Sequence, residues 1–105
     1  MFCLISTSVD NVDVAKNISH KIISSNLAFC VNISSPLIST YYWNNKVEES
    51  IEYKIEIKSV DKNKSRICKI IKQFHSYEIP EIISNDIIIE SNDYRDWANN
   101  ILRKG

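Results

Sequence analysis

The sequence predicts an α+β fold. Residues 51–58 alternate strictly between apolar and charged side chains, which is the period of a strand with one buried face. Two stretches with helical periodicity, residues 10–26 and 61–74, separate the strand-like runs. The resulting order is β-α-β-β-α-β with a further helix at the C-terminus. Two interleaved β-α-β units of this kind predict a ferredoxin-like plait, in which two helices cover one face of a four-stranded sheet.

Composition limits the class of protein. The chain has 105 residues, enough for one domain, so we expect residues 1–105 to form a single unit. Thirteen basic residues balance thirteen acidic ones, and the formal net charge is zero. This balance does not favour binding to nucleic acid or to an anionic membrane. The single glycine, Gly105, excludes glycine-rich phosphate loops.

The cysteines indicate a reducing compartment. Cys3, Cys30 and Cys68 are odd in number and include no C-x-x-C spacing, so neither a disulfide framework nor a structural zinc site is favoured. The first residues form a strand-like run, without the features of a signal peptide or a membrane span. We therefore expect a cytoplasmic protein with no membrane span in this chain.

The first half of the chain predicts a strand, a helix and a long hairpin. Residues 2–7 form an apolar strand, and Asp10 is the predicted N-cap of a helix that ends near Asn26. A second strand spans residues 27–33, and Pro36 interrupts it because proline cannot donate to a sheet. The strand resumes at Leu37. The predicted buried stripe of the helix consists of Val14, Ala15, Ile18, Ile22 and Ile23.

The hairpin spans residues 39–58 and turns at Asn44-Asn45, where asparagine tolerates the positive φ angles of a tight turn. We expect one face of its second strand to be buried and the other to be charged. The predicted buried residues are Ile51, Tyr53, Ile55 and Ile57, and the predicted charged residues are Glu52, Lys54, Glu56 and Lys58.

The second half predicts a helix from Asp61, with His75 at its C-terminal end, and an extended connection at Pro80. The predicted apolar stripe of this helix consists of Ile67, Ile70, Ile71 and Phe74. Residues 81–84 and 87–89 are short strand segments on either side of a turn or bulge at 85–86. A final helix is capped by Ser91, Asn92 or Asp93, and its predicted apolar face contains Tyr94, Trp97, Ala98, Ile101 and Leu102.

The sheet face that the two helices leave open is the predicted contact surface. Phe29, Val31, Ile33, Tyr41 and Trp43 give the second strand more apolar surface than one helical layer covers. A large exposed apolar patch is typical of a partner interface, and unpaired strand edges are usually covered. The residues alone therefore predict a homo-oligomer.

Four blocks resemble the CutA family, the divalent-cation tolerance proteins. They are LAFCVNI (27–33), STYYW with KVE (39–43 and 46–48), HSYEIPEI (75–82) and YRDW (94–97). The resemblance implies a ferredoxin-like fold, a tight homotrimer and a link to copper and other divalent cations. It also implies kinship of architecture with the trimeric PII signalling proteins. It implies no catalytic reaction, so we expect a protein that is not an enzyme.

The chain departs from the family pattern where copper ligands are expected. Ser6 stands where members often carry a cysteine, and Phe74 precedes His75 where some have paired histidines. A hydroxyl is a poor copper ligand compared with a thiolate. Ser76 replaces a proline and Asn45 replaces a glycine of the hairpin turn, and we expect the fold to tolerate both.

The predicted metal ligands are His75, Glu78, Glu81 and Cys30. An imidazole with one or two carboxylates suits a borderline divalent cation, and a neighbouring subunit would complete the set. The structural alternative is that His75 caps its helix, that the glutamates are solvated or paired with lysine, and that Cys30 is a small apolar packing residue.

Four aromatic residues, Tyr41, Trp43, Tyr77 and Trp97, are predicted to line either a subunit interface or a small-ligand pocket. An acylphosphatase-type enzyme would need an arginine after the first strand, and residues 6–10 contain none. An RNA-binding plait would need a basic, aromatic sheet face. Two functions remain open: a metal-tolerance protein that binds cations itself, and a trimeric PII-like module that binds a small ligand or a protein.

Overall fold

The computed structural model describes residues 1–104. Their elements, in chain order, are β1 (Phe2–Val9), α1 (Val12–Ser24), β2 (Cys30–Ile33), β3 (Leu37–Trp43), β4 (Lys46–Val60), a short 3-10 helix (Asp61–Asn63), α2 (Lys64–Phe74), β5 (Ile83–Ile87) and α3 (Asn92–Arg103). None of the described helices is both long enough and apolar enough to cross a membrane.

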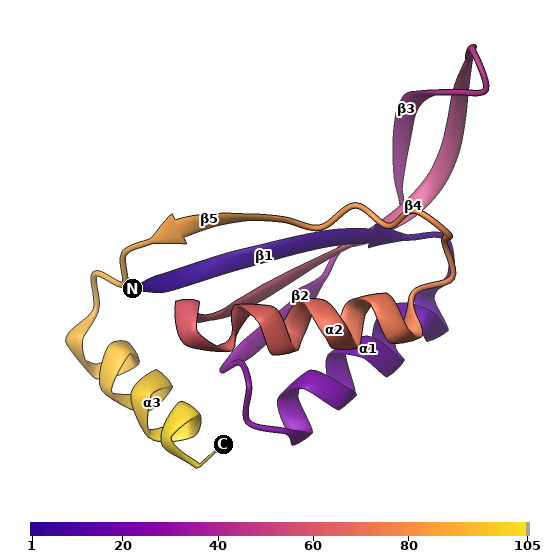
Figure 1. The fold of residues 1–105 in the computed structure, drawn as a ribbon. Helices are drawn as coiled ribbons and strands as arrows, with labels where there is room; N and C mark the ends of the chain where they lie inside the picture. Colours follow the sequence, from indigo (N-terminus) through magenta and orange to yellow (C-terminus); the bar gives the residue numbers. More distant parts are fainter. Residues whose placement is uncertain (105) are drawn as a thin grey trace.

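The sheet has the order β2-β4-β1-β5, all neighbours are antiparallel, and β3 pairs with β4 beyond the end of β2. Helices α1 and α2 lie side by side on one face of it (Figure 1). The predicted ferredoxin-like plait is confirmed. The sheet has five strands instead of four because residues 34–36, which end in Pro36, separate β2 from β3 along one long partner strand.

The main core lies between the sheet and the two helices. Isoleucines dominate it, and they are fully buried: Ile5, Ile55 and Ile57 from the sheet, with Ile18, Ile22, Ile67 and Ile71 from the helices. The predicted stripes of α1 and α2 therefore supply the core, apart from Ile23, which is exposed. A second cluster forms where α3 places Ala98 and Leu102 against Phe29 and Ile89.

The helix caps differ in part from the prediction. Asn11, not Asp10, caps α1, because its side chain accepts hydrogen bonds from the backbone N–H groups of Asp13 and Val14. Asp10 instead accepts a hydrogen bond from the Ser76 hydroxyl at 2.9 Å. Ser91 caps α3, one of the three predicted choices.

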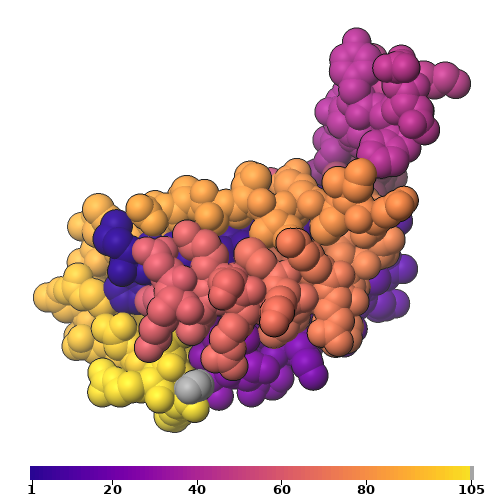
Figure 2. All heavy atoms as spheres, viewed as in Figure 1, coloured from indigo at the N-terminus to yellow at the C-terminus, as the bar shows by residue number. Residues whose placement is uncertain are grey.

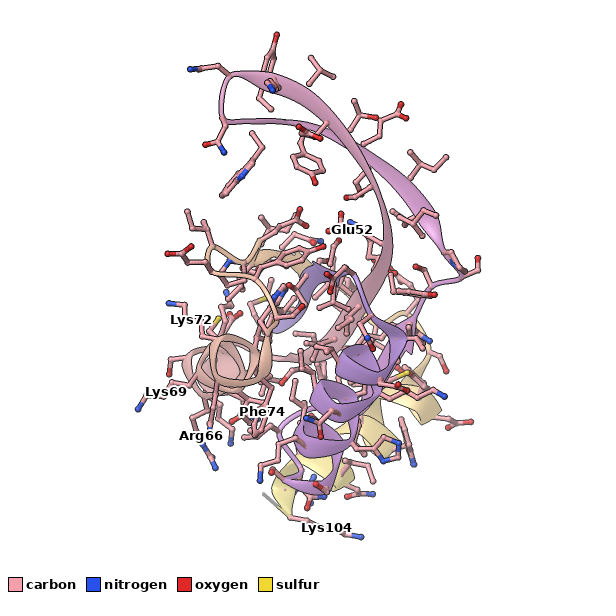
Figure 3. The ribbon with its side chains drawn as sticks, turned by 90° about the vertical axis from the view of Figure 1, so that its right-hand side faces the viewer. Glu52, Arg66, Lys69, Lys72, Phe74 and Lys104 are labelled. Carbon is pink, nitrogen blue, oxygen red and sulfur yellow. The ribbon has the colours of Figure 1, made fainter. Side chains whose placement is uncertain are left out.

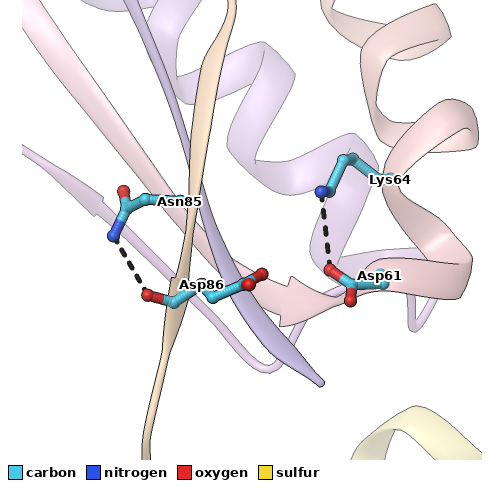
Figure 4. Close-up of polar contacts among 4 residues, drawn as sticks. All are labelled: Asp61, Lys64, Asn85 and Asp86. Atoms are coloured by element: carbon cyan, nitrogen blue, oxygen red, sulfur yellow. Dashed lines mark hydrogen bonds and ion pairs between the residues drawn. The ribbon is translucent and has the colours of Figure 1, made fainter.

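An ion pair of 3.4 Å joins Asp61 to Lys64 at the start of α2 (Figure 4). The predicted turn at residues 85–86 is wrong. Asn85 and Asp86 lie inside β5, opposite Leu4 and Cys3 of β1, and Asn85 bonds the Asp86 carbonyl (Figure 4). Pairing with β1 satisfies their backbone groups and overrides a low intrinsic strand preference.

The hairpin of β3 and the first part of β4 extends beyond the body as an arm, defined here as residues 37–52 (Figures 1 and 2). The φ angles of Asn44 and Asn45 are 51° and 63°, so the predicted asparagine turn is confirmed. The last residue of β4 that pairs with β1 is Tyr53. From there to its tip the arm is only two strands wide.

The predicted apolar patch on the open sheet face is wrong for three of its five residues. Phe29 is buried under α3, while Val31 and Ile33 pack against the main core. Tyr41 and Trp43 are exposed, but they belong to the arm. Ile51, predicted to be buried, is 63% exposed because no helix reaches that part of β4.

Candidate functional site

A cleft of about 690 Å³ lies between the arm and the segment that joins α2 to β5. The arm contributes Tyr41 and Trp43 from β3 and Glu52 from β4, and the joining segment contributes Tyr77, Glu78 and Glu81. The remaining lining residues are Ser8, Ser39, Thr40, Ser76 and Ile79. Small-molecule sites commonly have this volume and this mixture of aromatic and polar walls.

The register of the arm determines which side chains face the cleft. Opposed residues of paired strands share a face, and successive residues alternate. Tyr41 pairs with Glu48 and Trp43 with Lys46, and by the same alternation Glu52 lies on their side of the ribbon. The opposite side carries the apolar residues Ile38, Tyr42, Val47 and Ile51, with Thr40 and Glu49 between them. The arm therefore has a cleft face with aromatic and acidic residues and an outer face that is mainly apolar.

His75 fixes the joining segment to the body. Its Nε2 atom lies 3.0 Å from the Ser8 carbonyl oxygen and 3.1 Å from the Thr7 hydroxyl, and its Nδ1 atom accepts a hydrogen bond from the Tyr77 N–H at 3.0 Å. Because Nδ1 is an acceptor, the neutral ring carries its proton on Nε2 and donates it to the Ser8 carbonyl. Both ring nitrogens are therefore occupied.

Burial lowers the pKa of His75, because a charged imidazolium loses solvation there. The Ser8 carbonyl and the carboxylates of Asp10 and Glu52 oppose this shift without reversing it. The neutral ring is the form that can accept the Tyr77 N–H, so the shift favours the geometry that holds the segment.

Glu52 is a buried carboxylate in the wall of the cleft. It is only 8% exposed, and the Tyr77 hydroxyl donates a hydrogen bond of 2.6 Å to its Oε2 atom. Burial, and then the neighbouring Glu52 carboxylate, raise the pKa of Tyr77, which keeps the phenol protonated as the donor. Figure 3 shows Glu52 beneath the arm.

Among residues 1–104, no basic side chain forms an ion pair with Glu52. The pair formed by Asp61 and Lys64 is the one ion pair found among residues 1–104. Figure 3 shows Arg66, Lys69 and Lys72 at α2, and none of them lines the cleft. Buried glutamates are rare unless they are paired, so this carboxylate is an unusual feature.

Three of the four predicted aromatic residues meet in the cleft: Tyr41, Trp43 and Tyr77. Trp97 does not. It lies on α3, stacked on Tyr94 with ring centroids 5.4 Å apart, and it meets the edge of Phe29 at 6.3 Å. It therefore lies half-exposed on α3 against Phe29 and does not line the cleft.

The predicted metal ligands are separated. Glu78 and Glu81 line the cleft, whereas His75 is not part of its lining and both of its ring nitrogens are hydrogen-bonded. Cys30 packs beside the Phe29 cluster, with its thiol 3.8 Å from the Asn32 side-chain oxygen. Within residues 1–104, no three His, Cys, Asp or Glu side chains approach closely enough to hold a metal ion.

Sequence reasoning missed Glu52, Ser8 and Ser76 as cleft residues. Alternation placed Glu52 on a charged, solvated face, and nothing local marks it as buried. The HSYEIPEI segment offered a weak signal, because a tyrosine beside a helix end needs a partner for its hydroxyl when it is buried. The sequence did not show that the partner lies 25 residues away on another strand.

Comparisons with known proteins agree with this architecture. The profile of the family described as "CutA1 divalent ion tolerance protein" matches residues 3–101. The rice protein "CutA 1, chloroplastic" is 31% identical over 96% of the chain, and the Xenopus laevis "CutA homolog" is 33% identical over 88%. The chain spans 57% and 61% of the length of these two relatives. A Yersinia pestis divalent-cation tolerance protein is 31% identical, with 81% of the chain and 71% of that protein covered.

Several solved structures have the same fold as this chain. CutA1 from Oryza sativa superposes with a TM-score of 0.92 at 30% identity, covering 99% of this chain and 95% of that one. The divalent cation tolerance protein of Thermus thermophilus gives 0.88 at 30% identity, covering 93% and 95%. The Archaeoglobus fulgidus protein, described as periplasmic, gives 0.91 at 25% identity, covering 97% and 99%. Because the relatives are assigned to different compartments, a cytoplasmic location stays a prediction.

Proposed function

The chain belongs to the CutA1 divalent ion tolerance family, and from this premise we propose that it is a non-catalytic divalent-cation tolerance protein that works as a homotrimer. The family and its relatives are named for tolerance of cations and not for a reaction. The observation that carries the proposal is the arm, whose cleft face is acidic and aromatic and whose outer face is apolar.

The outer face of the arm supports the trimer. Ile38, Tyr42 and Ile51 are 71%, 76% and 63% exposed, and they lie together on one side of the ribbon. Within the described part of the chain, strand β3 pairs with β4 and with no other strand, so its other edge has free backbone groups. Natural proteins cover such edges and apolar surfaces, and further copies of this chain provide a matching ribbon for both.

The trimer is tested by light scattering on the purified chain. We expect a particle of three times the 12.2 kDa chain mass, and we expect Tyr42→Lys to shift it toward the monomer. Ile88→Lys is the matched control, because Ile88 is equally exposed, at 76%, but lies outside the arm. A lone 12.2 kDa particle at micromolar concentration would contradict the proposal.

The cleft supports binding of a cation. Three glutamates, Glu52, Glu78 and Glu81, belong to its lining, and its described residues include no lysine or arginine. Such a lining attracts cations and repels phosphate-bearing ligands, which favours the cation-binding function over a module for anionic ligands. We propose that Glu78 and Glu81 contribute to a divalent-cation site that a second subunit completes, while His75 positions their segment.

Calorimetric titration with Cu(II) and Zn(II) tests this assignment. We expect Glu78→Gln combined with Glu81→Gln to weaken binding by about tenfold or more. His75→Gln should weaken it much less, and Cys30→Ser should leave it unchanged. Loss of binding in His75→Gln, with the trimer intact, would return the ligand role to the imidazole. Absence of any heat with either metal would contradict a cation site.

A further inference from the structure

The wall of the cleft contains a carboxylate, that of Glu52, which is not among the metal ligands proposed above. Glu52 is only 8% exposed as a residue, and one of its two oxygens, Oε2, accepts a hydrogen bond from the Tyr77 hydroxyl. Every buried side-chain oxygen among residues 1–104 has a hydrogen-bond partner, so the exposed part of Glu52 includes its other oxygen. No residue among 1–104 donates a hydrogen bond or an ion pair to the other oxygen, Oε1. Glu52 also lines the cleft. A buried carboxylate with a free oxygen at a cavity wall is matched by a ligand that brings positive charge and N–H donors.

The positions of the acidic groups indicate how the positive charges of that ligand are arranged. Glu52 lies on β4, whereas Glu78 and Glu81 lie on the opposite wall, and the three do not converge as they would around a metal ion. Separated carboxylates match separated positive charges. A single point charge would leave at least one of the walls without a partner.

The aromatic walls indicate which chemical group connects the positive charges of the ligand. Tyr41, Trp43 and Tyr77 line the cleft together. Aromatic faces bind methylene groups by apolar contact, and they attract the polarised carbons next to an ammonium through their negative faces. The cleft has carboxylates on opposite walls and aromatic side chains in the same cavity. This combination fits a flexible apolar chain that carries positive charges at intervals.

We propose that the cleft binds a linear polyamine, a chain of methylene groups that carries two or more ammonium groups. One ammonium donates to the free oxygen of Glu52, and another binds Glu78 or Glu81 across the cleft. The methylene chain lies against Tyr41, Trp43 and Tyr77. The proposal shares Glu78 and Glu81 with the divalent-cation site proposed above, but its first contact, Glu52, and the aromatic walls are not among the metal ligands proposed there.

Fluorescence titration of the full chain tests the site. Trp97→Phe leaves Trp43 as the one remaining tryptophan, and it lies in the cleft wall. In metal-free buffer at constant ionic strength we expect putrescine and spermidine to change its emission saturably. Butanediol, which has the same length as putrescine without charge, and an equivalent amount of sodium chloride should not.

Matched substitutions assign the binding to Glu52. Glu52→Gln keeps an acceptor for Tyr77 but removes the charge, and we expect putrescine binding to weaken by about tenfold or more. Glu56→Gln makes the same change of charge on the same strand outside the cleft lining, and it should bind like the parent. If Glu52→Gln does not fold, Glu78→Gln with Glu81→Gln, both exposed positions, provides the second comparison and should weaken binding similarly.

Three results would overturn the proposal: no saturable response to either amine, equal binding by the parent and the folded Glu52→Gln variant, or equally tight binding of tetramethylammonium. The last would indicate a cage for one charge and not a site for spaced charges. Because metal is absent from these titrations, they are unaffected by failure of the divalent-cation site.

Discussion

Strand β4 belongs to two different regions of the molecule. Its second part, residues 53–60, lies between β1 and β2, and Ile55 and Ile57 are fully buried against the two helices. Its first part, residues 46–52, pairs with β3 and with no other strand of residues 1–104, and Ile51 is largely exposed. The alternation of apolar and charged residues that begins at Ile51 crosses from the first part into the second. Burial therefore depends on what covers the strand and not on the strand's own pattern.

The two parts differ in a way that fits two roles. In the body, α1 and α2 cover the apolar face of the sheet, as a stable domain requires. The arm leaves its outer face uncovered and forms one wall of the cleft with the other face. The side chains of the arm are not needed for the core and are available for contacts with other molecules. The proposed interface residues and several of the proposed ligand residues lie on the arm.

The largest expected effect contrasts two isoleucines of β4. Ile57→Ala should lower the free energy of unfolding by about 2–5 kcal/mol, because it leaves a cavity in the main core. Ile51→Ala should change the stability of the dissociated chain by less than about 0.5 kcal/mol, because no helix covers that side chain. Urea titrations at low protein concentration measure both.

Equal losses in the two variants would show that the arm is part of the same packed core. If the chain is trimeric, Ile51→Ala should instead alter the concentration dependence of unfolding, since the mutation then acts on association. Ile57→Ala should lower stability at every concentration.

A middle-sized effect is expected where the regions meet. The hydrogen bond from Tyr77 to Glu52 joins the segment after α2 to the base of the arm. Tyr77→Phe should cost about 1–3 kcal/mol, because it removes the one donor to a buried carboxylate oxygen. Thermal and urea unfolding measure the loss.

A double-mutant cycle with Glu52→Ala, which removes the acceptor, separates this bond from loss of packing. We expect the two substitutions to be non-additive, because each removes part of the same contact. Strict additivity would mean that the contact does not link arm and body in solution.

The body could be predicted from the sequence and the arm could not, for a physical reason. Helical and strand periodicities report which face of an element is apolar, and in the body a covering element exists for each such face. Ile18, Ile22, Ile67 and Ile71 were therefore predicted correctly as core. In the arm the same alternation has no covering element, so Ile51 was misplaced.

The site was predicted in part for the same reason. Tyr41, Trp43, Tyr77, Glu78 and Glu81 were singled out as chemically able residues, and they meet in the cleft. Burial of Glu52 depends on a loop that crosses the strand from elsewhere in the sequence, which no local pattern encodes. Trp97 was assigned to the same group by its residue type alone, although α3 carries it to Phe29.

The smallest expected effect concerns the histidine that holds the joining segment. Burial lowers the pKa of His75 below its ordinary value of 6.5, so the unfolded chain binds a proton more readily than the folded one. This contribution to stability is present above pH 6.5 and is lost as the pH falls from there toward the lowered pKa of the folded state. Protonation would also remove the Nδ1 acceptor of the Tyr77 N–H.

Urea midpoints at about pH 7 and about pH 5 test this linkage. The parent should lose more stability between them than His75→Gln, which has no titrating ring. His20→Gln, a matched change at an exposed histidine of α1, should keep the parent's dependence. If His75→Gln and the parent respond identically to pH, the ring does not hold the segment in its neutral form. The cleft wall would then depend on the Ser76 and Tyr77 hydrogen bonds alone.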